Sequence, residues 1–178
     1  DPETSDLLDN FSEEFFQLRK HKGISKEDAR NAVLDPLYFG AMLVYSDNAQ
    51  GMVAGSINAT GNVLKPAFQI IKTEENISVV SSSFIMNVPD SDMGSDGIFI
   101  FADCAVNPNP DSEQLAEIAI SSANTAKSLL DIDPVVALLS FSTKGSAKHD
   151  LVDKVRKATE IAQNNAPKLK IDGELQAD

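Results

Sequence analysis

Apolar residues recur at helical spacing over the first 45 residues of the chain. Residues 1–20 place leucines and phenylalanines among acidic residues, mostly on one face of a helix. Gly23 ends this helix, and residues 25–34 predict a second helix that starts with a capping box. Residues 37–45 predict a third helix, which is apolar nearly all round and is therefore expected to be buried.

The next stretch alternates short apolar runs with polar turns. Residues 51–54 predict a short strand, and residues 56–62 predict a polar turn. An amphipathic helix follows on Leu64, Phe68 and Ile71. Strand, turn and helix thus succeed one another, as they do in α/β proteins.

Two further runs are rich in β-branched and aromatic residues. Residues 77–88 and 98–104 predict strands, with a loop rich in glycine and aspartate between them. Asn109 is a candidate cap for a helix that begins at Pro110 and continues at helical spacing to Leu130.

The last third of the chain predicts a parallel sheet. Residues 135–139 form an uninterrupted apolar run that is too short for a helix and typical of a central strand covered on both faces. Residues 149–165 predict a helix, and residues 169–176 predict a closing strand. Strands that alternate with helices through short connections predict an α/β fold, a three-layer α/β/α sandwich with a mostly parallel sheet.

Composition narrows the classes of partner. The chain has 15 basic and 27 acidic residues, a formal net charge of −12 that repels nucleic acid. A crevice with clustered cations can still bind an anionic ligand. The single cysteine, Cys104, fits a reducing compartment, so we expect a cytoplasmic protein. No apolar run is long enough to cross a bilayer, and the absence of an initiator methionine favours a fragment or processed piece.

A polar loop follows the most apolar strand and is a candidate phosphate site. Residues 140–146 offer four serine or threonine hydroxyls, the cation of Lys144 and the flexible backbone of Gly145. Backbone N–H groups and a helix amino end can cradle phosphate in such a loop. A capped surface turn is the alternative interpretation.

A second polar turn precedes the helix that carries Lys65. In the first turn of a helix a cation faces the positive end of the dipole unless an anion binds between them, which favours a ligand. Taken alone, the turn is better interpreted as a cap of the helix, by Thr60 or Asn62.

The acidic residues do not predict a metal site. Residues 90–96 resemble a calcium loop only superficially, because Gly94 and Phe101 occupy two ligand positions. Asp172 and Glu174 alternate on one strand face, but without a third ligand nearby they are better interpreted as a polar strand end. We therefore predict no metal.

Several ungapped stretches, in order along the chain, carry a resemblance to a known family. They read LRKHKG at 18–23, DPLYFG at 35–40, QIIKT at 69–73, FADCAVNPNP at 101–110, LSFSTKGSAK at 139–148 and IDGELQ at 171–176. The chain with these motifs resembles phosphate acetyltransferases. The resemblance implies two α/β domains that flank a cleft, similar in fold to isocitrate and isopropylmalate dehydrogenases. Residues 1–75 would belong to the first domain and residues 76–178 to the second.

The resemblance also implies a reaction. The family interconverts acetyl phosphate plus coenzyme A with acetyl-CoA plus phosphate. The coenzyme A thiol would lose its proton and attack the acetyl carbonyl directly in a ternary complex, without an acyl-enzyme intermediate. Coenzyme A is then a substrate, no cofactor is held tightly, and the expected assembly is a homodimer.

Candidate residues for binding coenzyme A or phosphate lie in both predicted domains. They are Arg19, Thr60, Gly61, Lys65, Ser142, Thr143, Lys144, Gly145 and Ser146. Arg19 matches a family arginine. Lys65 replaces an arginine that the family typically has, so a single point charge stands in place of a group that can bind an anion in a bidentate manner. The family's Asn-Asp-Leu-Ser-Arg-Gly motif and its aspartate base lie beyond Asp178, so we predict that the fragment alone is inactive.

Two other functions stay open on the sequence. One is a non-catalytic binding or regulatory domain of the kind that some malic enzymes carry. The other is a phosphate butyryltransferase, which differs in acyl pocket volume at about 0.8 kcal/mol per buried methylene. The stretch FADCAVNPNP favours acetyl transfer.

Overall fold

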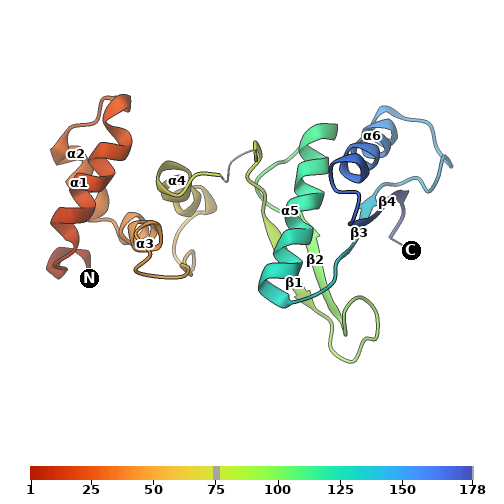
Figure 1. Cartoon of the computed structure of the whole chain (residues 1–178), viewed down its shortest axis with the longest axis horizontal. Coiled ribbons are helices and arrows are strands. Elements are labelled where there is room, and N and C mark those ends of the chain that lie inside the picture. Colours follow the sequence, from red (N-terminus) through yellow and green to blue (C-terminus); the bar gives the residue numbers. More distant parts are fainter. Residues whose placement is uncertain (74–76, 178) are drawn as a thin grey trace. The chain divides into compact units, whose positions relative to one another are not determined.

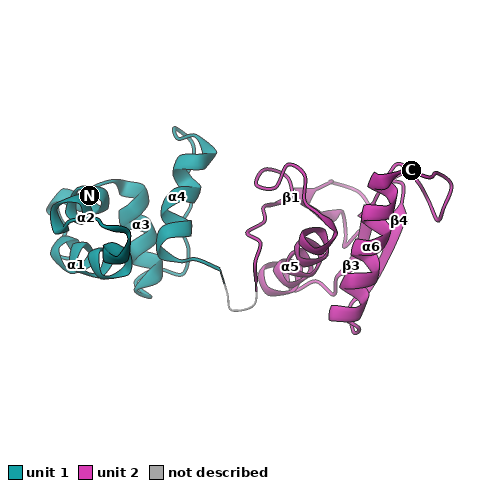
Figure 2. Cartoon of the chain, turned by 90° about the horizontal axis from the view of Figure 1, so that it is seen from above, with its two compact units in different colours: residues 1–74 teal, residues 75–178 magenta. Residues whose placement is uncertain are grey.

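The structure, a computed structural model, describes residues 1–73 and 77–177. The chain divides into two compact units, Asp1–Glu74 and Glu75–Asp178 (Figure 2). That these units are parts of two α/β domains, as expected from the sequence, stays a prediction.

Helices build the described part of the first unit (Figure 1). They are η1 (Pro2–Thr4), α1 (Leu8–Arg19), η2 (Lys20–Lys22), α2 (Lys26–Val33), α3 (Pro36–Tyr45) and α4 (Thr60–Ile70). Phe11 and Phe15 of α1, Val33 of α2, and Phe39 and Met42 of α3 share one buried core. The helices predicted over the first 45 residues are therefore confirmed.

Capping side chains explain why these helix boundaries could be predicted. The Ser25 hydroxyl accepts the Asp28 N–H at 3.0 Å, and the Asp28 carboxylate accepts the Ser25 N–H at 2.9 Å, a complete capping box. Asp35 accepts the Leu37 N–H at 2.7 Å at the start of α3. Gly23, with φ of 81°, follows η2 in the left-handed conformation.

The strand predicted at residues 51–54 is wrong. These residues have no regular structure, and Val53 is fully exposed. A short apolar run forms a strand only where a neighbouring strand pairs with its backbone, and here none does among the described residues. The predicted capping by Thr60 or Asn62 is also wrong, because Ala59 is the N-cap residue of α4 and makes no side-chain capping bond.

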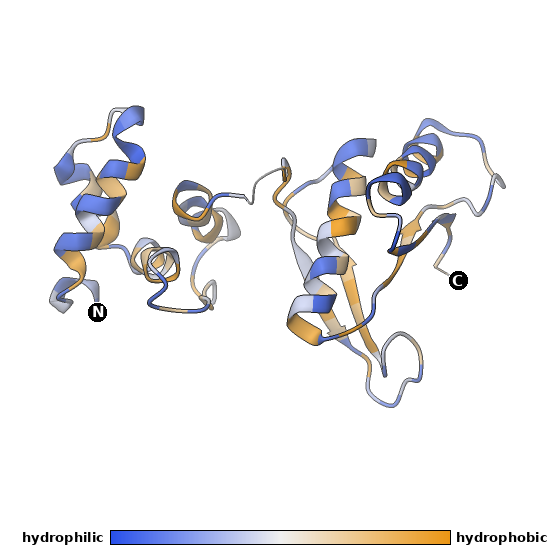
Figure 3. Cartoon of the chain, in the orientation of Figure 1, coloured by the Kyte–Doolittle hydropathy of each residue, from blue (hydrophilic) through white to orange (hydrophobic). Residues whose placement is uncertain are grey.

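The second unit combines helices with two small sheets (Figure 1). Its elements are β1 (Ser83–Asn87), β2 (Ile98–Ala102), α5 (Ser112–Leu130), β3 (Val135–Leu139), α6 (Asp150–Asn165) and β4 (Lys170–Leu175). Ala116 of α5 and Ala158 of α6 share a core with Leu138 of β3 and Ile171 of β4. In Figure 3 the helices carry both orange and blue residues, as amphipathic helices do. The predicted α/β class is confirmed.

The two sheets differ in strand direction. β3 and β4 pair in parallel and are connected through α6, as predicted. β1 and β2 pair antiparallel, with Ser83 opposite Ala102 and Asn87 opposite Ile98. The short connection at residues 88–97 reverses the chain and contains no crossover helix, which parallel strands need. The prediction of a mostly parallel sheet is therefore supported by β3 and β4 alone.

Burial also differs from the prediction at β3. Val135 is 74% exposed and Leu139 is 47% exposed, so the apolar run is not covered on both faces within the described residues. The strand predicted at residues 77–88 is confirmed only over Ser83–Asn87.

Helix α5 begins later than predicted because a different residue caps it. The Asp111 carboxylate accepts the N–H groups of Glu113 and Gln114, and the Gln114 side chain accepts the Asp111 N–H at 3.0 Å. Asn109, the predicted cap, instead accepts a hydrogen bond from Lys154 at 3.1 Å. A reciprocal capping box satisfies more orphan backbone donors than a single cap does.

Asp103 closes the turn that follows β2. Its carboxylate accepts hydrogen bonds from the Ser82 hydroxyl, from the Asn107 side chain, and from the N–H groups of Ala105, Val106 and Asn107 at 2.8 to 3.0 Å. Burial acts to raise the pKa of Asp103, but these hydrogen bonds, led by the one from Ser82, hold that pKa well below its ordinary value.

Replacing Asp103 by asparagine is expected to weaken the acid sensitivity of folding. A lowered pKa in the folded state contributes stability that is present above the unfolded pKa and is lost as pH falls through the folded pKa. Asp103→Asn should lower the free energy of unfolding by about 2 kcal/mol at pH 7. Below about pH 5 the variant's free energy of unfolding should fall less on acidification than that of the wild type. Urea unfolding at neutral and acidic pH measures both effects, with exposed Asp133→Asn as the control. If the free energy of unfolding fell equally on acidification in the wild type and in Asp103→Asn, this account would be contradicted.

Candidate functional site

Residues 140–147, here called the β3–α6 loop, lie at the carboxyl end of β3. The Ser140 N–H donates to the Leu175 carbonyl at 2.7 Å, which continues the pairing of β3 with β4 into the loop. Gly145 has φ of 87°, a conformation that favours glycine, and lets the loop turn back toward α6. Ligand crevices of α/β sheets form at this end of the strands.

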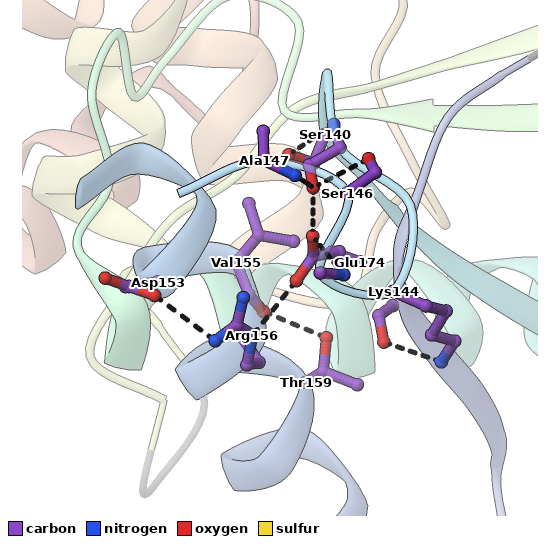
Figure 4. A network of polar contacts seen from close by, with 12 residues as sticks. Ser140, Lys144, Ser146, Ala147, Asp153, Val155, Arg156, Thr159 and Glu174 are labelled. Atoms are coloured by element: carbon purple, nitrogen blue, oxygen red, sulfur yellow. Dashed lines mark hydrogen bonds and ion pairs between the residues drawn. The ribbon is translucent and has the colours of Figure 1, made fainter. Parts of the chain in front are cut away.

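A buried carboxylate on β4 holds this loop (Figure 4). The side chain of Glu174 is only 1% exposed. Its Oε1 accepts hydrogen bonds from the Ser142 hydroxyl and from the Gly145 N–H, the latter at 3.1 Å, and its Oε2 accepts from Arg156 Nε at 3.0 Å. The bond from Ser142, with those from Gly145 and Arg156, holds the pKa of Glu174 below its ordinary value against the effect of burial.

The hydroxyls of the loop form hydrogen bonds within the loop and with Gln176. Ser142 is fully buried and accepts the Ala147 N–H at 2.9 Å. The Ser146 hydroxyl accepts the Thr143 N–H at 3.0 Å and lies 3.2 Å from the Ser142 hydroxyl. Thr143 donates to the Gln176 side chain at 3.1 Å and accepts the Gln176 N–H at 3.0 Å. These hydroxyls therefore fix the conformation of the loop.

Lys144 is engaged as well. Its ammonium forms an ion pair with Asp172 and donates to the Gly173 carbonyl at 2.9 Å. The hydrogen bond from Lys144 lowers the pKa of Asp172. An anion that binds Lys144 would have to compete with this carboxylate, which lies on the exposed face of β4.

The two acidic residues of β4 each form an ion pair with a cationic side chain and are not arranged as ligands of one metal ion. Asp172 pairs with Lys144, and Glu174 pairs with Arg156. Across residues 1–73 and 77–177, no cluster of three or more histidine, cysteine or acidic side chains could hold a metal ion. No helix in the same described ranges has the length and apolar character needed to span a membrane.

A cleft of about 540 Å³ opens beside the β3–α6 loop. Its lining residues are Lys144, Gly145, Ala147, Lys148, Asp153, Arg156, Gly173 and Glu174. Arg156 also contacts Asp153 at 3.4 Å, so its charge is shared between two carboxylates. Lys148 is exposed, and within the described part of the chain no acidic side chain pairs with it. Lys148 is thus the most available cation of the cleft for an anionic ligand.

Sequence reasoning missed Lys148, Arg156 and Glu174 as parts of this site. The expectation that Asp172 and Glu174 share one strand face is wrong, because Asp172 is exposed and Glu174 is buried. The pairing of β3 with β4 shifts register between Leu138 and Leu139, opposite this part of β4, so strict alternation does not hold here. Period-two alternation in the sequence therefore could not reveal the buried carboxylate or its cationic partner.

Arg19 ends α1 in the first unit and is half-buried. Burial raises the pKa of Tyr38, and the positive charge of Arg19 acts against that rise. Arg19 is therefore within electrostatic reach of the Tyr38 hydroxyl, which also lies 3.2 Å from the Gln69 side chain of α4.

Thr60, Gly61 and Lys65 lie near the start of α4 and are exposed. The prediction that Lys65 lies in the first turn of the helix is wrong. Helix α4 begins at Thr60, which places Lys65 in the second turn. The helix dipole acts mainly within the first turn, so it gives little reason for an anion at Lys65. The candidates thus fall into two groups, four residues in the first unit and the loop residues in the second.

Residues 1–178 match the family model described as phosphate acetyl/butaryl transferase. The chain belongs to this family. It is 56% identical to a phosphate acetyltransferase of Thermoanaerobacterium thermosaccharolyticum and 51% identical to one of Clostridium acetobutylicum, over all of this chain and 54% of each relative. A solved phosphotransacetylase from Streptococcus pyogenes superposes with a TM-score of 0.88 at 48% identity, covering 99% of this chain and 52% of that one.

Membership of the phosphate acetyl/butaryl transferase family confirms the resemblance seen in the sequence motifs. The chain spans about half the length of the relatives it matches. The β3–α6 loop and its cleft therefore belong to a phosphate acetyl/butaryl transferase chain whose relatives extend well beyond the matched region.

Proposed function

We propose that the protein containing this chain transfers an acetyl group between acetyl phosphate and coenzyme A. The family match over residues 1–178 carries this proposal. The cleft beside the β3–α6 loop supports it, because Lys148 and Arg156 line the cleft and both substrates carry phosphate groups.

The proposed reaction is a direct acyl transfer. The coenzyme A thiol loses its proton, and the thiolate sulfur attacks the acetyl carbonyl carbon. A C–S bond forms, the C–O bond to phosphate breaks, and orthophosphate leaves. Such a reaction is accelerated by positioning the substrates and neutralising their charge. The protein must therefore provide cations and N–H groups at fixed positions.

We assign phosphate or coenzyme A binding to candidates in both units. Arg19, Thr60, Gly61 and Lys65 supply the first unit's contacts, with Arg19 and Lys65 as the cations. In the second unit the β3–α6 loop supplies its backbone and Lys148 supplies charge. The side chains of Ser142, Thr143, Lys144 and Ser146 already bind within the chain, which supports a role in shaping the loop.

The same proposal covers location and assembly. We propose a cytoplasmic homodimer that uses coenzyme A as a substrate and holds no cofactor tightly. The net charge of −12 disfavours nucleic acid as a partner.

Thioester formation from coenzyme A, measured with acetyl phosphate and butyryl phosphate side by side, tests the proposal. The longest natural reading frame that contains this chain is the protein to use. Faster turnover of acetyl phosphate supports the proposal. Faster turnover of butyryl phosphate would make the protein a phosphate butyryltransferase, and turnover of neither would favour a non-catalytic binding domain.

A further inference from the structure

Glu174 is the one fully buried acidic side chain among the described residues. A buried carboxylate is costly unless hydrogen bonds and a nearby cation compensate it. Glu174 meets this requirement with donors from two elements, the β3–α6 loop and α6 (Figure 4). The loop donors are the Ser142 hydroxyl and the Gly145 N–H, and the α6 donor is Arg156.

The contacts of Glu174 reach several residues of the loop. Ser142 lies near its start, and Gly145, like Lys144 before it, has a positive φ. The Glu174 carbonyl also accepts the Lys144 N–H at 3.2 Å. One residue of β4 therefore fixes three successive parts of the loop.

Glu174 also fixes a cation of the cleft. Arg156 donates a hydrogen bond from its Nε to Glu174, and one of its terminal nitrogens forms an ion pair with Asp153. These two contacts orient the guanidinium plane at the cleft wall. Asp153 is 66% exposed, so this second contact is weak by comparison with the one to the buried carboxylate.

We infer that Glu174 is a positioning residue, whose buried carboxylate holds the β3–α6 loop and Arg156 in the geometry that receives a phosphate-bearing substrate. This inference rests on the proposed function for the substrate and on the observed contacts for the positioning. Glu174 also lines the cleft, but its carboxylate oxygens are bound by Ser142, Gly145 and Arg156. Removing this carboxylate should therefore weaken substrate binding more than it slows the chemical step in the enzyme–substrate complex.

The test compares Glu174→Gln, Ser142→Ala and the double variant in the full-length protein. Glutamine keeps the size of the side chain but removes the charge that Arg156 and Ser142 bind. Both single variants should raise KM for coenzyme A or acetyl phosphate roughly 10-fold, with kcat within about 3-fold. The double variant should raise KM little beyond Glu174→Gln, because both changes remove the same contact.

Asp133→Asn is the matched control. Asp133 is an exposed carboxylate that pairs with Lys170 at the far end of β4, at 3.3 Å. Its loss should leave KM and kcat unchanged. A lower melting temperature for Glu174→Gln with unchanged KM would overturn the inference and leave Glu174 a purely structural residue.

Hydrogen exchange separates failure of this inference from failure of the proposed function. In Glu174→Gln the N–H groups of Gly145 and Ala147 should exchange roughly 10-fold faster or more, while those of the β1–β2 hairpin keep their rates. This result supports positioning even if the wild type turns over neither acyl phosphate. Unchanged exchange in the loop would overturn the inference whatever the activity.

Discussion

A Gly173→Ala protein is expected to be less stable by about 3 kcal/mol and to unfold roughly 10 °C lower than wild type. An added Cβ at residue 173 would lie 2.3 Å from the Thr159 hydroxyl, 3.0 Å from Leu138 Cβ and 3.2 Å from the Leu138 carbonyl. Thr159 and Leu138 are both buried, and the Thr159 hydroxyl is held by the Val155 carbonyl at 2.9 Å. The neighbours therefore cannot move aside without breaking the packing of β4 on α6.

Thermal unfolding followed by circular dichroism measures this effect. Gly51→Ala is the control, because a Cβ there meets no atom within 4 Å, and its melting temperature should stay within about 2 °C. Adding Thr159→Ala to Gly173→Ala removes the closest clashing atom and should restore part of the loss. A Gly173→Ala protein as stable as wild type would contradict the close packing of β4, α6 and β3.

Lys65→Ala in the full-length protein should lower kcat/KM for acetyl phosphate roughly 10- to 100-fold. This is the effect of losing one charged hydrogen bond to a phosphate group. Lys65→Arg should keep or raise kcat/KM, because a guanidinium binds phosphate through two parallel N–H groups. Lys65 is exposed on α4, where an anionic ligand can reach its ammonium group.

Lys26→Ala is the matched lysine control for this series. Lys26 lies in the same unit and pairs on the surface with Glu13, the two side chains being 69% and 48% exposed. Removing an exposed pair of this kind should leave kcat/KM unchanged. Equal activity of Lys65→Ala and Lys26→Ala would exclude Lys65 from phosphate binding.

Local signals explain the parts of the fold that the sequence predicted. Ser25 and Asp28 make a complete capping box within four residues of chain, and Asp35 caps α3 just before its proline. The apolar run Val135–Leu139 and the periodic segment after His149 have the lengths of a strand and a helix, and the structure forms both. The two caps form within a few residues of chain, whereas the strand also needs its pairing with β4.

The wrong predictions depend on competition or on distant partners. Asn109 and Asp111 are both residue types that cap helices well. Asp111 is the N-cap residue because it forms a reciprocal pair of hydrogen bonds with Gln114. Residues 51–54 have strand-like composition but no strand to pair with among the described residues. The direction of β1 against β2 follows from the turn between them, which composition does not reveal.

The candidate site shows the same division. The position of the β3–α6 loop follows from the local pattern of strand, polar turn and helix. The contacts of Ser142 and Lys144 with residues of β4 join segments about thirty residues apart, and no local pattern specifies them. As a result, side chains that suggested direct ligand contacts are found bound to Glu174 and Asp172.

Exchange of labelled phosphate into acetyl phosphate tests the central claim, direct transfer between acetyl phosphate and coenzyme A, most directly. The full-length protein is incubated with acetyl phosphate and isotopically labelled orthophosphate, with and without coenzyme A. Direct transfer predicts that label enters acetyl phosphate only when coenzyme A is present. Exchange without coenzyme A would show an acyl-enzyme intermediate, and no exchange under either condition would show that the protein does not transfer the acetyl group.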